Sequence, residues 1–307
     1  MPLPRRLLSI ATIPALLGAC ASGPSGTAGS APVQGGVAGA ILERASRTPG
    51  ATVRVVAARL DGRGQRIAIN ADSLVHAAST MKVPVMIALA QAADRGVLRL
   101  DDPVPLTNRF ASIVDGSPYT LDRADDSDDA VYARVGERVP IRWLATRMIT
   151  HSSNLATNTL LTVVRADSVT ALTRTLGTTR MLVRRGVEDT PAFNAGLNNV
   201  TTANDLAALL VAIATDRAAS QQSCGWMRDV LFAQVFNTAI PAGLPQGTRV
   251  AHKTGDITRV EHDAALVYPA RGAPYVLVVL TSGIERQVDA RALIADIARL
   301  VHPVMQR

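Results

Sequence analysis

An apolar run from Val83 to Ala93 constrains the fold more than any other stretch of the chain. It is apolar on nearly every side, which is typical of a buried helix rather than an amphipathic surface helix. Pro84 is tolerated only near a helix start, so the helix must begin close to it. The sequence therefore predicts that Ser79 and Lys82 lie at the N-terminus of a buried helix, one turn apart on one face.

These two residues suggest a chemical role. A serine hydroxyl is a weak nucleophile until a neighbour takes its proton, and a lysine can do so when burial or nearby positive charge lowers its pKa. Ser-x-x-Lys also occurs often by chance, so the pattern alone is weak. Lysine usage strengthens it: of 32 Lys and Arg residues, only Lys82 and Lys253 are lysine. A GC-rich gene explains the abundance of arginine but not the presence of lysine at these two positions. Of the two side chains, only lysine can readily lose its proton.

Residues 1–19 are predicted to be a secretory signal, because two arginines precede an apolar stretch too short to span a membrane. The stretch ends in Leu-Gly-Ala-Cys, which resembles a bacterial lipoprotein cleavage box and implies lipid attachment to Cys20. An ordinary signal with a chance cysteine is the alternative. Residues 20–36 are rich in Gly, Ser, Ala and Pro and predict a flexible tether. We therefore expect a domain facing the periplasm and held to a bacterial membrane by a lipid.

Composition narrows the classes of partner. The net charge of +7 is spread without basic runs or interleaved aromatics, which argues against nucleic acid. Cys20 and Cys224 are the only cysteines, so the lipidated protein has no intrachain disulfide, and Cys224 is expected to be buried and structural. No metal or nucleotide cofactor is indicated. We expect a monomer that acts on a small molecule or a peptidoglycan peptide.

The order of predicted elements indicates an α+β fold. Two strand groups enclose a long helical middle, and the groups are expected to join in one antiparallel sheet. The sheet part would comprise residues 37–75 and 236–307, and the helical part residues 76–235. The expected strands are 52–60, 65–69, 249–252, 263–268 and 275–281, and the expected helices are 38–49, 141–149, 155–164, 202–214 and 288–301.

Three polar segments interrupt this pattern. Residues 101–135 are loop-like and acidic, and the cluster 125–129 resembles a calcium loop only superficially because the ligand spacing is missing. A solvated or capping cluster is the favoured interpretation. Ser152 and Asn154 lie between two apolar helices, as a helix cap or as a polar loop in a cleft. Residues 184–199 are irregular, and a loop of that length is typically functional or disordered.

Three short motifs follow one another along the chain: Ser79-Thr80-Met81-Lys82, Ser152-Ser153-Asn154 and Lys253-Thr254-Gly255. They resemble the active-site motifs of class A β-lactamases and penicillin-binding proteins. The resemblance covers roughly residues 37–307, and three matches in order are far more specific than one. It implies a five-stranded antiparallel sheet flanked by helices, an all-helical subdomain, and a cleft between them.

The resemblance also implies residue roles. Ser79 would attack a lactam or peptide carbonyl and form an acyl-enzyme, with Lys82 accepting its proton. Ser152, assisted by Lys253, would pass a proton to the leaving nitrogen. Glu188 is the only glutamate in the loop where the family carries its deacylating base.

Other positions would bind the substrate. Asn154 would hydrogen-bond the substrate side-chain amide, while Lys253 and Thr254 would hold its carboxylate. Gly255 completes the third motif. The backbone N–H groups of Ser79 and Asp256 would form the oxyanion hole.

The chain departs from the family pattern in three places. Ser153 stands where the lactamase motif commonly has Asp, the loop around Glu188 lacks the usual Arg-x-Glu-Pro pattern, and residues 110–132 form a longer stretch than usual. These departures bear on deacylation and antibiotic range more than on acylation.

The main prediction is therefore a serine β-lactamase. A D-alanyl-D-alanine peptidase of the same superfamily and a non-catalytic cell-wall-binding lipoprotein are the alternatives. Two further possibilities are weaker. A hydrolase using His262 and Asp263 would lack a Gly-x-Ser-x-Gly elbow, and a site built from several histidines would lack metal-ligand spacing.

Overall fold

The protein is described by a computed structural model for residues 36–64 and 66–307. The predicted signal, Cys20 and the tether as far as residue 35 lie outside the described residues. Within them, no helix is both long enough and apolar enough to cross a membrane.

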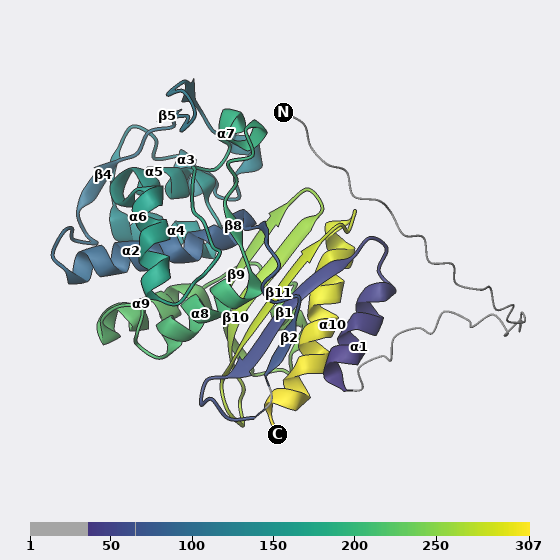
Figure 1. Ribbon diagram of the computed structural model, residues 1–307. Coiled ribbons are helices and arrows are strands. Elements are labelled where there is room, and N and C mark those ends of the chain that lie inside the picture. The colour runs from purple at the N-terminus through teal and green to yellow at the C-terminus, as the bar shows by residue number, and fades with distance from the viewer. Residues whose placement is uncertain (1–35, 65) are drawn as a thin grey trace, which may run out of the picture. The chain divides into compact units, whose positions relative to one another are not determined.

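A five-stranded antiparallel sheet with the order β2-β1-β11-β10-β9 forms one part of the fold, beside a helical part (Figure 1). The N-terminal strands therefore join the C-terminal ones through the β1–β11 pair, which aligns Thr52 with Ser282. The predicted α+β fold with a five-stranded antiparallel sheet is confirmed. The strands are β1 (Thr52–Arg59), β2 (Ile67–Ile69), β9 (Arg249–Ile257), β10 (Val260–Tyr268) and β11 (Tyr275–Ser282).

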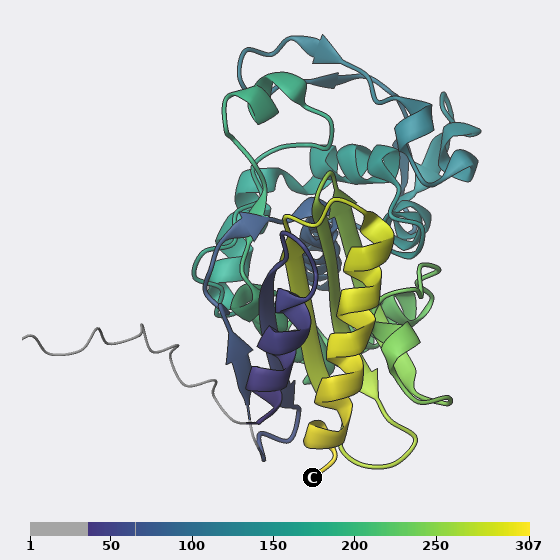
Figure 2. The ribbon, with the colours of Figure 1, turned by 90° about the vertical axis from the view of Figure 1, so that its right-hand side faces the viewer.

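Both faces of the sheet are covered, which explains why β11 is almost continuously apolar. On one face, Leu277 and Val279 pack under α1 (Val37–Ser46) and α10 (Gln287–Met305), which lie side by side (Figure 2). On the other face, Val276, Val278 and Leu280 belong to the core shared with the helical part. Because successive side chains of a strand point to opposite faces of the sheet, β11 contributes residues to two separate hydrophobic cores.

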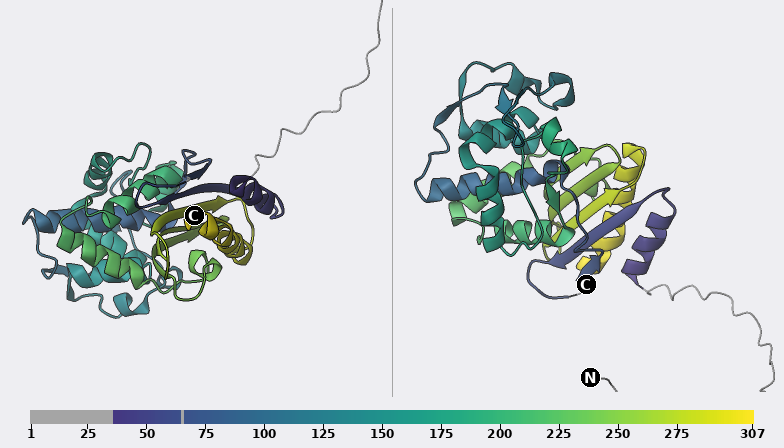
Figure 3. Two further views of the ribbon diagram at one scale, coloured as in Figure 1. Left: turned by 90° about the horizontal axis from the view of Figure 1, so that it is seen from below. Right: turned by 45° about the horizontal axis from the view of Figure 1, so that its top comes forward.

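The helical part is built around α2 (Lys82–Asp94), which runs through the middle of the helices (Figure 3). Every residue of α2 from Lys82 through Ala90 is buried. The prediction of an all-round buried helix is confirmed. Helices α8 and α9 contact the sheet, whereas α4, α5 and α6 lie farther out around α2. The remaining longer helices are α4 (Ile141–Thr150), α5 (Asn154–Val164), α6 (Ala166–Thr175), α8 (Ala203–Ala214) and α9 (Gln221–Phe232).

Short elements join these helices. The predicted loop of residues 101–135 contains several of them, and the irregular loop 184–199 contains one short helix. They are β3 (Val75–His76), η1 (Ala78–Met81), β4 (Pro103–Pro105), β5 (Phe110–Ala111), β6 (Pro118–Tyr119), η2 (Arg123–Asp125), α3 (Asp129–Tyr132), β7 (Arg138–Pro140), α7 (Thr190–Asn194), β8 (Val200–Thr201) and η3 (Ile240–Gly243).

Several local predictions are confirmed and others are corrected. The helix expected over 202–214 is α8, with Thr202 as its N-cap, and Cys224 is buried in α9 as a free thiol, as expected. Neither α6 nor α9 was predicted. The strand expected to end at His252 continues through the third motif to Ile257, because β10 pairs with it along its whole length.

Candidate active site

Ser79 lies in the short 3₁₀ turn η1, and Lys82 is the first residue of α2. Ser79 lines a cleft of about 570 Å³, whereas Lys82 is completely buried. Ala78, directly before the serine, has a left-handed backbone with φ 45°, a conformation that non-glycine residues rarely adopt. Such strain is often concentrated at functional sites because the surrounding packing must enforce it.

The Lys82 amine is held by the Ser152–Asn154 turn. Its Nζ donates to the Ser152 carbonyl oxygen at 2.5 Å and to Asn154 Oδ1 at 2.8 Å, and it lies 3.2 Å from Ser152 Oγ. Burial lowers the Lys82 pKa well below its usual value, and the neighbouring Lys253 lowers it further. The lysine is therefore suited to accept a proton.

Lys253 reaches Ser152 from the other side of the cleft. Its Nζ donates to Ser152 Oγ at 3.0 Å and to the Thr254 carbonyl oxygen at 2.9 Å. Its side chain is buried, and desolvation lowers its pKa to about 7. The two lysines of the chain thus meet at one hydroxyl.

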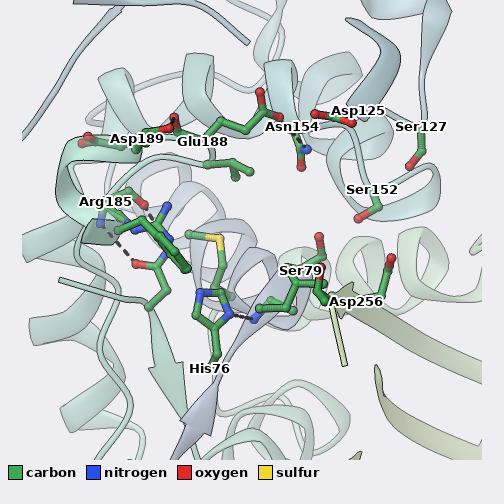
Figure 4. Close-up of a pocket in the computed structure, with 18 residues that line it drawn as sticks. His76, Ser79, Asp125, Ser127, Ser152, Asn154, Arg185, Glu188, Asp189 and Asp256 are labelled. Carbon is green, nitrogen blue, oxygen red and sulfur yellow. Dashed lines mark hydrogen bonds between the residues drawn. The ribbon is translucent and has the colours of Figure 1, made fainter. Parts of the chain in front are cut away.

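The Ser152–Asn154 turn is both a helix cap and a polar loop in a cleft, so the two interpretations of its sequence hold together. Ser153 is the N-cap of α5, and its Oγ accepts from the Ala156 N–H at 3.2 Å. Ser152 and Asn154 face the cleft (Figure 4). Ser152 has φ 58°, again left-handed.

Strand β9 passes very close to the serine turn at Gly255. A Cβ at this position would lie 2.9 Å from the Ser79 backbone nitrogen and 2.8 Å from that of Thr80. Only glycine allows this approach. Asp256, the next residue, lines the cleft beside Ser79 (Figure 4).

Glu188 lines the same cleft from the 184–199 loop. Its Oε1 accepts from Asn154 Nδ2 at 3.2 Å, and its Oε2 accepts from the Asp122 N–H at 3.0 Å. Asn158 holds the loop, accepting from the Val187 N–H at 2.7 Å and donating to the Val187 carbonyl oxygen at 2.9 Å. Burial raises the Glu188 pKa. Glu188, Asn154 and Lys82 therefore form one hydrogen-bonded series.

In and just before the acidic cluster 125–129, two aspartates act as helix caps and Asp129 is exposed and paired with Arg123, which fits the capping or solvated interpretation for these residues. Asp122 caps η2 and Asp128 caps α3. Asp126 is different, because its Oδ2 accepts from the Leu155 N–H in the first turn of α5 at 2.8 Å. Asp126 is not among the site residues predicted from the sequence, because no local pattern separates it from the neighbouring aspartates.

The histidines lie in other arrangements. Asp263 is hydrogen-bonded to His252 Nδ1 at 2.9 Å rather than to His262, and His252 Nε2 contacts Asn237. The His262 ring is buried between the backbone carbonyl oxygens of Glu261 and His76. Among the described residues, no group of three or more His, Cys, Asp or Glu side chains is placed to hold a metal ion.

Residues 37–305 match the Beta-lactamase enzyme family. The chain belongs to this family. A β-lactamase of Rhodobacter capsulatus is 26% identical over 242 residues, covering 76% of this chain and 77% of the relative. The crystal structure of a β-lactamase from Sphaerobacter thermophilus DSM 20745 aligns with a TM-score of 0.75 and 28% identity, over 88% of this chain and 97% of that one. PBP-A aligns with a TM-score of 0.75 and 25% identity, over 87% and 94%.

This β-lactamase family member is a serine hydrolase of β-lactamase type, as its sequence predicted. The cleft brings together residues of the first two motifs, the residue directly after the third motif and the 184–199 loop, namely Ser79, Ser152, Asn154, Asp256 and Glu188. Lys82, Lys253 and Thr254 are buried and do not line the cleft themselves, and both lysine amines reach it through their hydrogen bonds to Ser152.

Proposed function

We propose that the protein hydrolyses the β-lactam amide through an acyl-enzyme on Ser79. One observation carries the assignment: both lysines of the chain are buried, and both donate to Ser152 Oγ in the cleft that Ser79 lines. Burying two amines beside one hydroxyl is costly for stability unless they serve chemistry, because each loses hydration and each repels the other when charged.

In acylation, neutral Lys82 takes the proton of Ser79 as its Oγ bonds to the lactam carbonyl carbon. The N–H groups of Ser79 and Asp256 hold the oxyanion, and losing one such donor typically costs about 10²–10³ in rate. As the C–N bond breaks, the ring nitrogen receives the Ser152 proton, which the Lys82 ammonium replaces. The ammonium of Lys253, with Thr254, holds the substrate carboxylate.

In deacylation, Glu188 takes a proton from water as the water oxygen bonds to the acyl carbon. The bond to Ser79 Oγ breaks, and the proton that Glu188 took passes to Ser79 Oγ, which restores the serine hydroxyl and the Glu188 carboxylate. A carboxylate with a raised pKa is a stronger base than an exposed one, and Asn154 and the Asp122 N–H orient it.

A D-alanyl-D-alanine peptidase is the second candidate. The likeness to PBP-A supports it, since one structure of a PBP-A point mutant is an acyl-enzyme complex with penicillin G. Both candidates acylate Ser79, so the rate of deacylation separates them.

The test compares wild type, Ser79→Ala and Glu188→Gln with a chromogenic cephalosporin and intact-protein mass spectrometry. The lactamase assignment predicts turnover by wild type, no adduct with Ser79→Ala, and a long-lived adduct with Glu188→Gln. A long-lived wild-type adduct favours the peptidase. A wild-type protein that no lactam or acyl-D-alanine ester labels would refute both assignments and leave a non-catalytic binder.

We further propose that the enzyme acts as a periplasmic monomer anchored through a lipid on Cys20. The cleavage box and the apolar, two-arginine signal segment support the anchor. Radiolabelled palmitate should enter wild type but not Cys20→Ala, and the variant should move to the soluble fraction. Light scattering of the purified domain measures the oligomeric state.

A further inference from the structure

The acidic segment 122–129 lies against the active-site turn and is more than a set of surface caps. Asp128 forms an ion pair with Arg147 of α4, just before the turn. Asp125 and Ser127, on either side of Asp126, line the cleft beside Asn154 and Ser152 (Figure 4). The segment is therefore tied to α4 by Asp128 and forms part of the cleft wall beside the turn.

Asp126 is the residue of this segment that reaches the second motif. Its Oδ2 accepts from the Leu155 N–H at 2.8 Å and from Ser153 Oγ at 3.3 Å. Ser153 is completely buried and occupies the position where the lactamase motif commonly has an aspartate. A carboxylate thus reaches the second motif from a position 27 residues earlier in the chain.

The contacts of Asp126 help to position Asn154, which hydrogen-bonds both Lys82 and Glu188. Asn154, between Ser153 and Leu155, binds Lys82 through Oδ1 and Glu188 through Nδ2. The Asp126 carboxylate accepts hydrogen bonds from Ser153 and Leu155, the two residues that flank Asn154. It therefore fixes the direction in which the Asn154 side chain points. Hydrogen bonds to a charged acceptor are about twice as strong as neutral ones.

Asp126 also influences the charge of Lys82. The charged groups that face this amine are Lys253 and Asp256 from β9, Glu188 from the 184–199 loop, and Asp126. Burial and Lys253 lower the Lys82 pKa. Of the carboxylates that raise it, Asp126 has the largest effect, ahead of Asp256 and Glu188.

We propose that Asp126 is a positioning residue for acylation, which supplies from the 122–129 segment the carboxylate that holds the Ser152–Asn154 turn against Lys82. The proposal rests on the proposed function, because it assigns Lys82 as the base. The 122–129 segment belongs to the stretch 110–132 that is longer than usual in this chain. It thereby supplies the carboxylate that is missing from the second motif at Ser153.

The test is Asp126→Asn, which keeps the shape and removes the charge. We expect kcat/KM for acylation to fall about 10–100-fold, as a displaced catalytic group does. Because a negative charge is lost, the Lys82 pKa falls further, and the acidic limb of the kcat/KM profile moves to lower pH. A purely structural role would lower the rate without moving the limb.

Two further variants complete the experiment. Asp129→Asn removes an aspartate of the same segment whose side chain is 80% exposed and paired with Arg123, so it should behave as wild type. Adding Ser153→Asp to Asp126→Asn returns a carboxylate to the turn and should recover at least about 10-fold of the rate. An unchanged rate in Asp126→Asn, or a loss with an unmoved limb that Ser153→Asp does not rescue, overturns the proposal.

The labelling rate of Ser79 by a fluorophosphonate separates this proposal from the proposed function. It reports how readily Lys82 activates the serine, whether or not any lactam is a substrate. If wild type reacts with the fluorophosphonate but with no lactam, the proposed β-lactamase function is refuted. The labelling rates of wild type and Asp126→Asn then still decide whether Asp126 positions the acylation site.

Discussion

Replacing Gly255 by alanine tests how closely β9 must approach the nucleophile. The added Cβ would lie 2.8 Å and 2.9 Å from two backbone nitrogens of η1, and neither can move aside as a flexible side chain would. Restoring ordinary contact at 3.4 Å requires the strand to recede by about 0.6 Å. The proposed oxyanion donors, Ser79 N–H and Asp256 N–H, lie on the two sides of this contact and would separate by a similar amount.

We expect Gly255→Ala to lower kcat/KM about 10–100-fold, because catalytic groups must be held within about 0.5 Å. The overpacking should also lower the free energy of unfolding by about 1–3 kcal/mol. Stopped-flow acylation by a chromogenic cephalosporin measures the first effect, and urea unfolding measures the second.

Gly225→Ala is the matched control. Gly225 lies inside α9, and the atom nearest to its added Cβ, outside the helix backbone, is Nη2 of Arg228 at 3.8 Å. This variant should keep full activity and gain about 0.5–1 kcal/mol, since alanine is the better helix former. Full activity in Gly255→Ala would refute the reasoning, as would an equal loss in both variants.

Three other predictions test separate contacts. Burial lowers the Lys253 pKa to about 7, so its ammonium is lost as pH rises above that value; KM for a carboxylate-bearing lactam should rise between pH 7 and 9, whereas Lys253→Arg, always charged, should show no such rise. Asn158→Ala removes both hydrogen bonds to Val187 and should slow deacylation about 10-fold or more while sparing acylation, as burst kinetics would reveal. Asp263→Ala leaves His252 Nδ1 and the Ile240 N–H without their buried partner and should lower the free energy of unfolding in urea by about 1–3 kcal/mol for each group left unpaired; a matching loss of kcat in the folded enzyme would contradict its structural role.

The parts of the fold that sequence alone predicted are those where one local property decides the structure. The all-round apolar character of α2 placed Ser79 at its start, and the near-absence of lysine singled out Lys82 and Lys253. The strands of the sheet were recognisable from their apolar runs. Helix α9 was missed because Gly225 and several polar residues weaken its pattern, so its helicity depends on tertiary packing.

Asp126 shows where sequence reasoning stops. It lies among aspartates that all resemble a solvated cluster, and its partners Ser153 and Leu155 are far along the chain. Which carboxylate turns inward is decided by the path of the 122–129 segment over α5. That path is a property of the folded backbone and leaves no local mark.

The β1–β11 pair sets the moment at which the enzyme becomes reactive. During synthesis β1 emerges long before its partner β11, so the sheet cannot close until the chain has been made through Ser282. Before closure both lysine amines are hydrated and fully protonated, and the serine is an ordinary alcohol. The growing polypeptide is therefore inert towards acyl donors, and its nucleophile comes into being only with the last strands.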